Sequence, residues 1–207
     1  MAKTTLPGVQ TLNGWLRKVP AWPVYAIAVL PPAWYLWQGL TGGLGVDPVK
    51  AMEHAIGLLA LQVLVATLAI TPLRKFSGLN LIKYRRALGL VGFFYVVLHL
   101  TVWWVLDVQI LAQVWADIVK RPYITVGMAA FVLLIPLAVT SNNLSIRKVG
   151  PLVWRRVHLL AYPAILLGAL HFIWLRKGFQ LEPMLYMAGI IGLLALRVEW
   201  KRRRAAA

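Results

Sequence analysis

The sequence predicts an all-α integral membrane protein, a bundle of six transmembrane helices with both termini in the cytoplasm. Three observations lead to this fold class. Of the 207 residues, 60% are hydrophobic and only 14% are charged, whereas soluble domains are roughly 45–50% apolar and about 25% charged. The apolar residues fall into six segments of membrane-spanning length. The basic residues fall mostly on one side of those segments.

Each of the six segments is long enough to cross the hydrocarbon layer, which takes roughly 20 residues of helix. Their approximate ranges are 22–40, 54–71, 87–107, 123–140, 157–175 and 184–200. The first segment contains Pro23, Pro31 and Pro32, so we expect it to be kinked or irregular. We expect residues 1–21 to be a cytoplasmic N-terminal segment without a cleavable signal peptide, and residues 201–207 to be a basic cytoplasmic tail.

The distribution of charge predicts the orientation of the bundle. One side holds 17 of the 22 Lys and Arg residues and one of the 6 acidic residues, and the other side holds five basic and five acidic residues. The positive-inside rule places the basic side in the cytoplasm. The basic residues of that side are Lys3, Arg17, Lys18, Arg74, Lys75, Lys83, Arg85, Arg86, Arg147, Lys148, Arg155, Arg156, Arg197 and the run Lys201 to Arg204.

A net charge of +16 is also typical of proteins that bind nucleic acid. Here, however, the basic residues are divided among four short stretches beside the membrane. That arrangement favours topology signals and contacts with anionic lipid headgroups. We therefore expect membrane lipids, and no nucleic acid, as partners.

The histidines are the main candidates for metal or proton chemistry, because the sequence contains no cysteine. His99 and His171 lie in the third and fifth segments, which run in the same direction, and a rise of 1.5 Å per residue places them within roughly 3 Å of the same depth. Two histidines at one depth on two helices can bind the two faces of a haem iron. Gly92 and Ala164 share the faces of these histidines and would leave room for the macrocycle. The alternative is that each histidine is buried and hydrogen-bonded to a neighbouring helix.

Two further histidines lie at segment ends. His158 is at the inner boundary, roughly 20 Å of helix below His171 and about 140° away around an ideal helix. It is either a ligand of a second, inner haem or an interfacial histidine near Arg155 and Arg156. The equivalent position of the third segment holds Arg85 or Arg86, and no histidine. His54, at the outer boundary, faces the edge of the haem, a partner protein or water.

Five stretches of the sequence form a pattern of motifs spread over most of the chain. They are GGLGVDPVKAMEH (42–54), ITPLRKF (70–76), RRALGLVGFFYVVLHL (85–100), RPYITVG (121–127) and WRRVHLLAYPAILLGALHFIW (154–174). In these stretches and their order the chain resembles the MsrQ (YedZ) family, the haem-binding membrane subunits of the periplasmic methionine sulfoxide reductase system. This family belongs to the ferric-reductase-like transmembrane group, so residues 22–200 are expected to form one six-helix ferric-reductase-like domain.

The resemblance implies a b-type cytochrome of the bacterial inner membrane. It also implies a bound FMN, which is attributed to the family. It implies electron transfer from the quinone pool or a cytoplasmic flavin reductase to a periplasmic molybdenum-cofactor subunit (MsrP-like), which reduces methionine sulfoxide in oxidised proteins. His99 and His171 match the outer haem ligands, and His158 matches the histidine linked to an inner haem. Eukaryotic oxidases of the wider group have two histidines on the equivalent of the third segment, where this chain has one. They also have a C-terminal flavin and nicotinamide domain, which we do not expect in this protein.

Three functions remain open from the sequence. The first is an electron-transfer subunit of an oxidoreductase, binding one or two haems b and having no substrate site of its own. The second is a stand-alone quinol- or metal-reducing b-type cytochrome, and the third is a non-redox six-helix transporter. On the cytoplasmic face, Arg85, Arg86, Arg155 and Arg156 could hold haem propionates, a flavin phosphate or an acidic donor protein, or could only anchor the chain to lipid.

Overall fold

The computed structural model describes residues 8–176 and 180–205, with side chains as far as Arg197. Lys3, Lys177 and residues 206–207 therefore lie outside the described residues, as do the side chains of Glu199 and of the tail at 201–205. Helices make up nearly all of the described chain, which contains no strand. The α-helices are α1 (Val9–Lys18), α2 (Pro23–Ala28), α3 (Leu30–Leu40), α4 (Pro48–Phe76), α5 (Arg85–Thr101), α6 (Leu111–Lys120), α7 (Pro122–Val139), α8 (Asn143–Val149), α9 (Pro151–Val157), α10 (Ala161–Leu175) and α11 (Leu181–Ala205). Two 3₁₀ turns, η1 (Ile82–Tyr84) and η3 (His158–Leu160), precede α5 and α10, and a π-helical stretch, η2 (Val102–Val108), extends α5.

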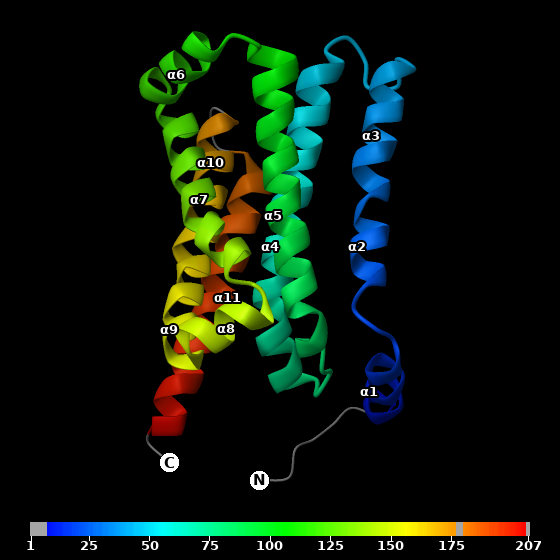
Figure 1. Ribbon diagram of the computed structural model, residues 1–207, viewed down its shortest axis with the longest axis vertical. Coiled ribbons are helices and arrows are strands. Elements are labelled where there is room, and N and C mark those ends of the chain that lie inside the picture. Colours follow the sequence, from blue (N-terminus) through cyan, green and yellow to red (C-terminus); the bar gives the residue numbers. More distant parts are fainter. Residues whose placement is uncertain (1–7, 177–179, 206–207) are drawn as a thin grey trace.

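The prediction of an all-helical membrane protein is confirmed. Four helical stretches of the described chain are long and apolar enough to cross a membrane, and they coincide with the second to fifth expected spans. They are Pro48–Phe76, Ile82–Val108, Pro122–Val139 and Pro151–Leu175. The first expected span is divided between α2 and α3, which lie end to end beside the bundle (Figure 1), and the sixth corresponds to α11. The total of six spans and the cytoplasmic position of both termini stay predictions.

The division of the first span follows from its prolines. Proline has no N–H, so Pro32 cannot donate to the carbonyl oxygen of Ala28 one turn earlier. The hydroxyl of Tyr95 on α5 donates to that oxygen instead, at 2.7 Å. A side chain from a neighbouring helix thus satisfies the freed backbone group, as the membrane interior requires.

The bundle is centred on α4, which packs extensively against α5, as α7 does against α10. The main core joins four helices, α4, α7, α10 and α11. Its buried members are Leu61, Leu64, Leu68, Leu134, Ala164, Ile165, Ala169 and Ile190. Many large apolar side chains on the outside remain exposed, as expected where the solvent is lipid.

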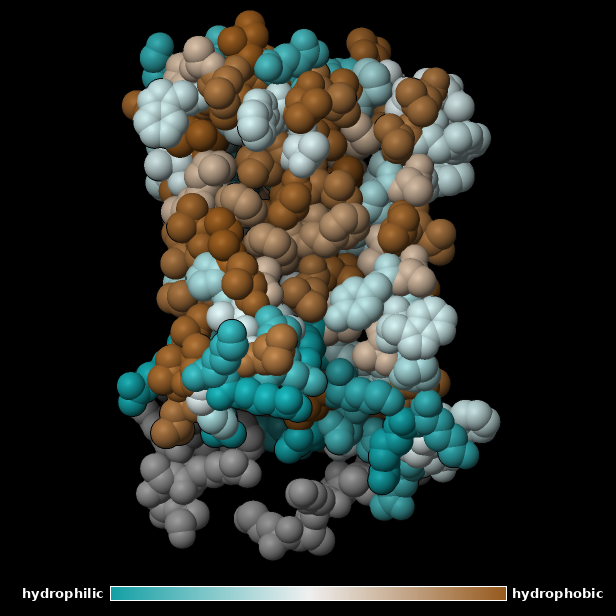
Figure 2. All heavy atoms as spheres, viewed as in Figure 1, coloured by the Kyte–Doolittle hydropathy of each residue, from teal (hydrophilic) through white to brown (hydrophobic). Residues whose placement is uncertain are grey.

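The two ends of the bundle differ. At one end α6 lies across the top of α7, whereas α1, α8 and α9 lie at the other end (Figure 1). Hydrophilic side chains form a belt at the end that contains α1 and α8 (Figure 2). The sequence pattern did not predict α1, whose C-terminal turn is fastened to η1: Lys83 Nζ donates to the backbone oxygens of Arg17 and Val19 at 2.8 and 2.7 Å.

Candidate haem site

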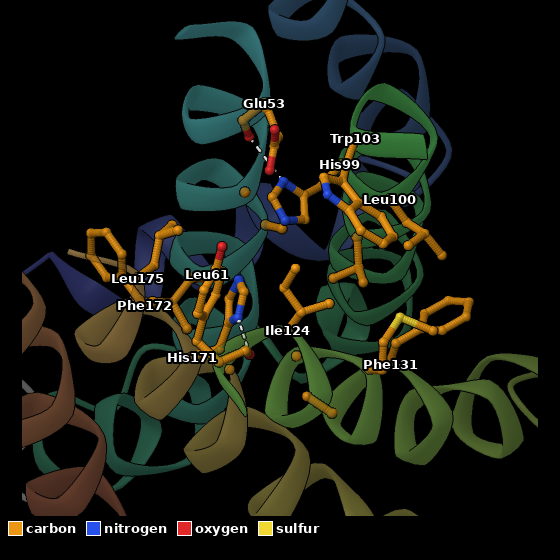
Figure 3. A pocket seen from close by; sticks show the side chains of 18 of the residues that line it. Glu53, Leu61, His99, Leu100, Trp103, Ile124, Phe131, His171, Phe172 and Leu175 are labelled. Carbon is orange, nitrogen blue, oxygen red and sulfur yellow. Dashed lines mark hydrogen bonds between the residues drawn. The ribbon is translucent and has the colours of Figure 1, made fainter. Parts of the chain in front are cut away.

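A cavity of about 220 Å³ lies between α4, α5, α7 and α10, and η2 closes part of it. Most of its wall is apolar, and both His99 and His171 contribute to the wall. Figure 3 shows the two imidazole rings pointing into the same space, with Leu61, Ile124 and Phe172 around them. The structure therefore brings together the two histidines that were predicted to lie at one depth.

His99 enters the cavity from α5 and is held by α4. Its Nδ1 lies 2.9 Å from the backbone oxygen of Glu53. A carbonyl oxygen can only accept a hydrogen bond, so Nδ1 carries the proton and donates it. The other ring nitrogen, Nε2, is then unprotonated and has a lone pair for a metal ion.

His171 repeats this arrangement from α10 against α7. Its Nδ1 donates to the backbone oxygen of Tyr123 at 2.7 Å, which fixes the same tautomer. Histidines that bind metal almost always donate their second ring N–H to a carboxylate, a backbone carbonyl or water. Both histidines therefore already make the supporting contact of a metal ligand.

The separation of the rings fits coordination of one ion between them. Their centres are 6.2 Å apart and their planes cross at 72°. Bonds of about 2 Å from two imidazoles to one metal ion would place the ring centres roughly 6 Å apart. Within the described part of the chain, no three His, Cys, Asp or Glu side chains gather into a protein-only metal site. Two imidazoles that face each other suit a metal whose other ligands belong to a cofactor, as in haem.

Polar side chains gather at one end of the cavity, next to η2 and the start of α7. They are Lys50, Glu53, His54, Asp107 and Arg121. A hydrogen bond from Arg121 to the hydroxyl of Tyr123 raises the pKa of Arg121, whose guanidinium is charged in any case. Its Nε also pairs with the buried Asp117 at 3.3 Å. This end of the apolar cavity thus carries two cations, Lys50 and Arg121, beside two carboxylates, Glu53 and Asp107.

The remaining predicted site residues do not line this cavity. The ring of His158 stacks on Trp154 with 3.8 Å between centres, and its Nδ1 donates to the backbone oxygen of Trp154 at 3.0 Å. Its Nε2 lies 3.4 Å from Ser141 Oγ. Arg86 donates to Asn143 on α8 at 2.9 Å. The side chains of Arg85, Arg86, Arg155 and Arg156 are exposed.

The small residues around the histidines are only partly those expected. Ala164 lines the cavity, but Gly92 packs against α4, where an added Cβ would lie 2.7 Å from a side-chain carbon of Leu64. Gly92 therefore does not line the cavity itself, and its role in making room for the macrocycle stays a prediction. Sequence reasoning instead missed Gly57 and Gly127, which lie against the two histidine rings. Gly57 and Gly127 each lie four positions after the residue whose backbone oxygen accepts from the histidine, Glu53 or Tyr123. This spacing could not be recognised in the sequence, because it has a meaning only when the helix facing each histidine is known.

Comparison with known proteins shows which family the chain belongs to. The model of the family described as ferric reductase like transmembrane component matches residues 51–169. The protein-methionine-sulfoxide reductase heme-binding subunit MsrQ of Agrobacterium fabrum is 48% identical over 178 residues, 86% of this chain and 82% of that protein. This chain belongs to the MsrQ family.

A second MsrQ relative, from Brucella anthropi, is 47% identical over 176 residues, 84% of this chain and 79% of that protein. A third, from Brucella ovis, is 46% identical over 178 residues, 86% of this chain and 80% of that protein. All three are named heme-binding subunits. No solved structure matches the chain. The predicted resemblance to the MsrQ family is confirmed.

Proposed function

We propose that this chain is the haem-binding membrane subunit of a methionine sulfoxide reductase system, with His99 and His171 as the two axial ligands of one haem b. One observation carries the proposal: two rings 6.2 Å apart, each with Nδ1 donating to a backbone oxygen and Nε2 left for a metal. The names of the MsrQ relatives supply the reductase system.

When bound, haem supplies one-electron redox chemistry at its iron. The chain contributes the two imidazoles, whose planes and tautomers are set by α4 and α7, and an apolar wall that keeps water from the site. Lys50 and Arg121 at the polar end are the cations available to the haem carboxylates. The chain needs no substrate site for this role, because it passes electrons on.

The orientation and partners are further parts of the proposal. Six spans with both termini in the cytoplasm of a bacterial inner membrane would put the cavity near the periplasm. The charge asymmetry supports this orientation, as does the position of α1, α8 and α9 opposite α6 (Figure 1). The acceptor would then be a periplasmic molybdenum-cofactor subunit (MsrP-like). The donor would be the quinone pool or a cytoplasmic flavin reductase.

We propose that the inner end of the bundle binds the remaining cofactors, a second haem and FMN. His158 has the same tautomer as the other two histidines, and among the described residues its Nε2 has one hydrogen-bond partner, the hydroxyl of Ser141. It is therefore the residue proposed to bind a second, inner haem. The exposed Arg85, Arg86, Arg155 and Arg156 are proposed to face the propionates of that haem, the phosphate of FMN or the donor.

A reduced-minus-oxidised optical spectrum of the purified full chain tests the central proposal. We expect a b-type spectrum from which His99→Ala and His171→Ala each remove the same haem, whereas Gln113→Ala, exposed on α6 and outside the cavity wall, should leave the spectrum unchanged. Absence of haem after expression with ample haem would instead favour the transporter. Reduction of a co-expressed periplasmic reductase subunit by the loaded chain distinguishes the electron-transfer subunit from a stand-alone cytochrome.

A further inference from the structure

We infer that Gly57 and Gly127 are positioning residues for haem ligation, each forming a notch in one helix into which the imidazole of a facing helix docks. The inference rests on the proposed function, since it concerns how His99 and His171 present Nε2 to a metal. Neither glycine belongs to the ligand set predicted from the sequence.

The two notches are built in the same way on different helices. On α4, Glu53 supplies the oxygen that accepts from His99, and Gly57 follows one turn later. On α7, Tyr123 supplies the oxygen that accepts from His171, and Gly127 follows one turn later. Within each helix the glycine N–H faces that same carbonyl group, which has a second lone pair for the imidazole.

A side chain at either glycine would collide with the ring. A Cβ on Gly57 would lie 2.9 Å from Nδ1 of His99, and a Cβ on Gly127 would lie 2.9 Å from Nδ1 of His171. Non-bonded atoms prefer separations of about 3.5–4.0 Å, so each ring would have to shift or rotate. The ring could then no longer keep its hydrogen bond and the direction of Nε2.

Close helix packing is the ordinary reason for glycine in a membrane helix, but it does not account for these two. At each position the three nearest atoms to the added Cβ all belong to the histidine ring, and none is backbone of the facing helix. By contrast, Gly89 and Gly192 have nothing within 4 Å of an added Cβ. The space at Gly57 and Gly127 is therefore used by the ligands.

The notches also set the angle between the ligands. Each ring is confined between a carbonyl oxygen and a glycine, and the two planes cross at 72°. In ferric low-spin haems, crossed imidazole planes give a more anisotropic electron paramagnetic resonance signal, with a larger highest g value, than parallel planes. If the two glycines set this angle, changing either of them should change the electron paramagnetic resonance signal of the bound haem.

The test uses the full-length, haem-loaded protein with Gly57→Ala and Gly127→Ala, and with Gly89→Ala and Gly192→Ala as matched controls. We expect the wild type and both controls to share a strongly anisotropic low-spin signal. Gly57→Ala and Gly127→Ala should shift that signal or convert part of it to high spin, with roughly 10–100-fold weaker haem retention, as for other outer-shell changes. Unchanged spectra and retention in both variants would overturn the inference and leave the haem proposal standing, whereas a wild type without haem overturns both.

A second set of variants covers a failure to fold. If Gly57→Ala lowers the yield or the melting temperature of the protein made without haem, the double variant His99→Ala/Gly57→Ala should restore it, because the clash involves only the ring. The same relation should hold for His171→Ala/Gly127→Ala. A folding defect that persists in the double variants would show that the glycines act elsewhere, and the inference would fail.

Discussion

Arg197 on α11 donates a hydrogen bond from Nη2 to the backbone oxygen of Leu68 on α4, at 2.5 Å. Leu68 lies one turn before Pro72, which has no N–H to offer that oxygen. The contact is thus the counterpart of the one from Tyr95 to Ala28. In both cases a proline leaves the carbonyl group one turn earlier without its helical partner, and a side chain from another helix satisfies it.

Replacing Arg197 by lysine should therefore destabilise the bundle although the charge is retained. Arg197 also donates from Nη1 to the hydroxyl of Tyr162 at 3.0 Å, and a single ammonium cannot reproduce this fork. Hydrogen bonds from charged groups contribute about 1.5–3 kcal/mol each, so we expect a loss of that order in the free energy of unfolding. The measurement is thermal unfolding in detergent, followed by circular dichroism.

The matched control is Arg147→Lys, since Arg147 is exposed on α8. We expect no change in its melting temperature. Tyr162→Phe removes only one of the two bonds from Arg197 and should give an intermediate effect. If Arg197→Lys has the same melting temperature as Arg147→Lys, the hydrogen bond to Leu68 contributes nothing to stability.

The spans could be predicted because a run of about 20 apolar residues has few alternatives to a membrane helix. The two amphipathic helices α1 and α6 could not. Each is ten residues long and has one apolar face. Along the sequence, polar residues alternate with the apolar ones, so no continuous apolar run marks the helix. α1 is defined by contacts with η1, far away in the chain, such as the bonds from Tyr84 to the backbone oxygens of Leu16 and Val19.

The candidate site was predictable in depth but not in its surroundings. A fixed rise per residue places His99 and His171 level with each other. Which helix each one faces depends on packing, which a single sequence does not show. Gly92 illustrates the difference: it shares the face of His99 as predicted, yet lower on α5 that face meets Leu64 of α4 instead of the cavity. The 3₁₀ turn at His158–Leu160 likewise changes the twist on which the angle between His158 and His171 depends.

The variant His158→Ala distinguishes a haem bound at the outer end of the bundle from one bound at the inner end. We expect it to keep the haem between His99 and His171, because His158 does not line their cavity. The haem-to-protein ratio, measured as the pyridine haemochromogen, then reports on the inner site. Loss of half the haem would establish an inner haem held by His158, and an unchanged ratio would refute one.

Ser141→Ala is the control for this experiment. It removes the only side chain hydrogen-bonded to His158 Nε2 in the described chain, and leaves the imidazole in place. We expect its haem content to match the wild type. Loss of the low-spin spectrum in His158→Ala, with Ser141→Ala intact, would contradict the assignment of the outer haem to His99 and His171.

Lysine 83 should control how firmly α1 is held. Lys83→Met removes two hydrogen bonds to α1. Both are exposed to solvent, which weakens them to about 0.5–1.5 kcal/mol each despite the charge of the donor, so α1 should detach about tenfold more often. Trypsin cleavage after Arg17 or Lys18 in inside-out membrane vesicles should accelerate by a similar factor, since cleavage follows the population of the open form. The control is Lys148→Met on α8, which leaves α1 untouched, and equal cleavage rates in the two variants would contradict the role of Lys83.

The proposed orientation can be tested directly because the sequence contains no cysteine. Single cysteines at Val46, between α3 and α4, and at Leu144 on α8 would provide unique labels at opposite ends of the bundle (Figure 1). Both side chains are exposed, at 105% and 66%. In cells with a permeabilised outer membrane, a membrane-impermeant maleimide should label Val46→Cys, whereas Leu144→Cys should react only after the inner membrane is opened. The reverse pattern would overturn the positive-inside assignment, and would move the cavity of His99 and His171 to the cytoplasmic side.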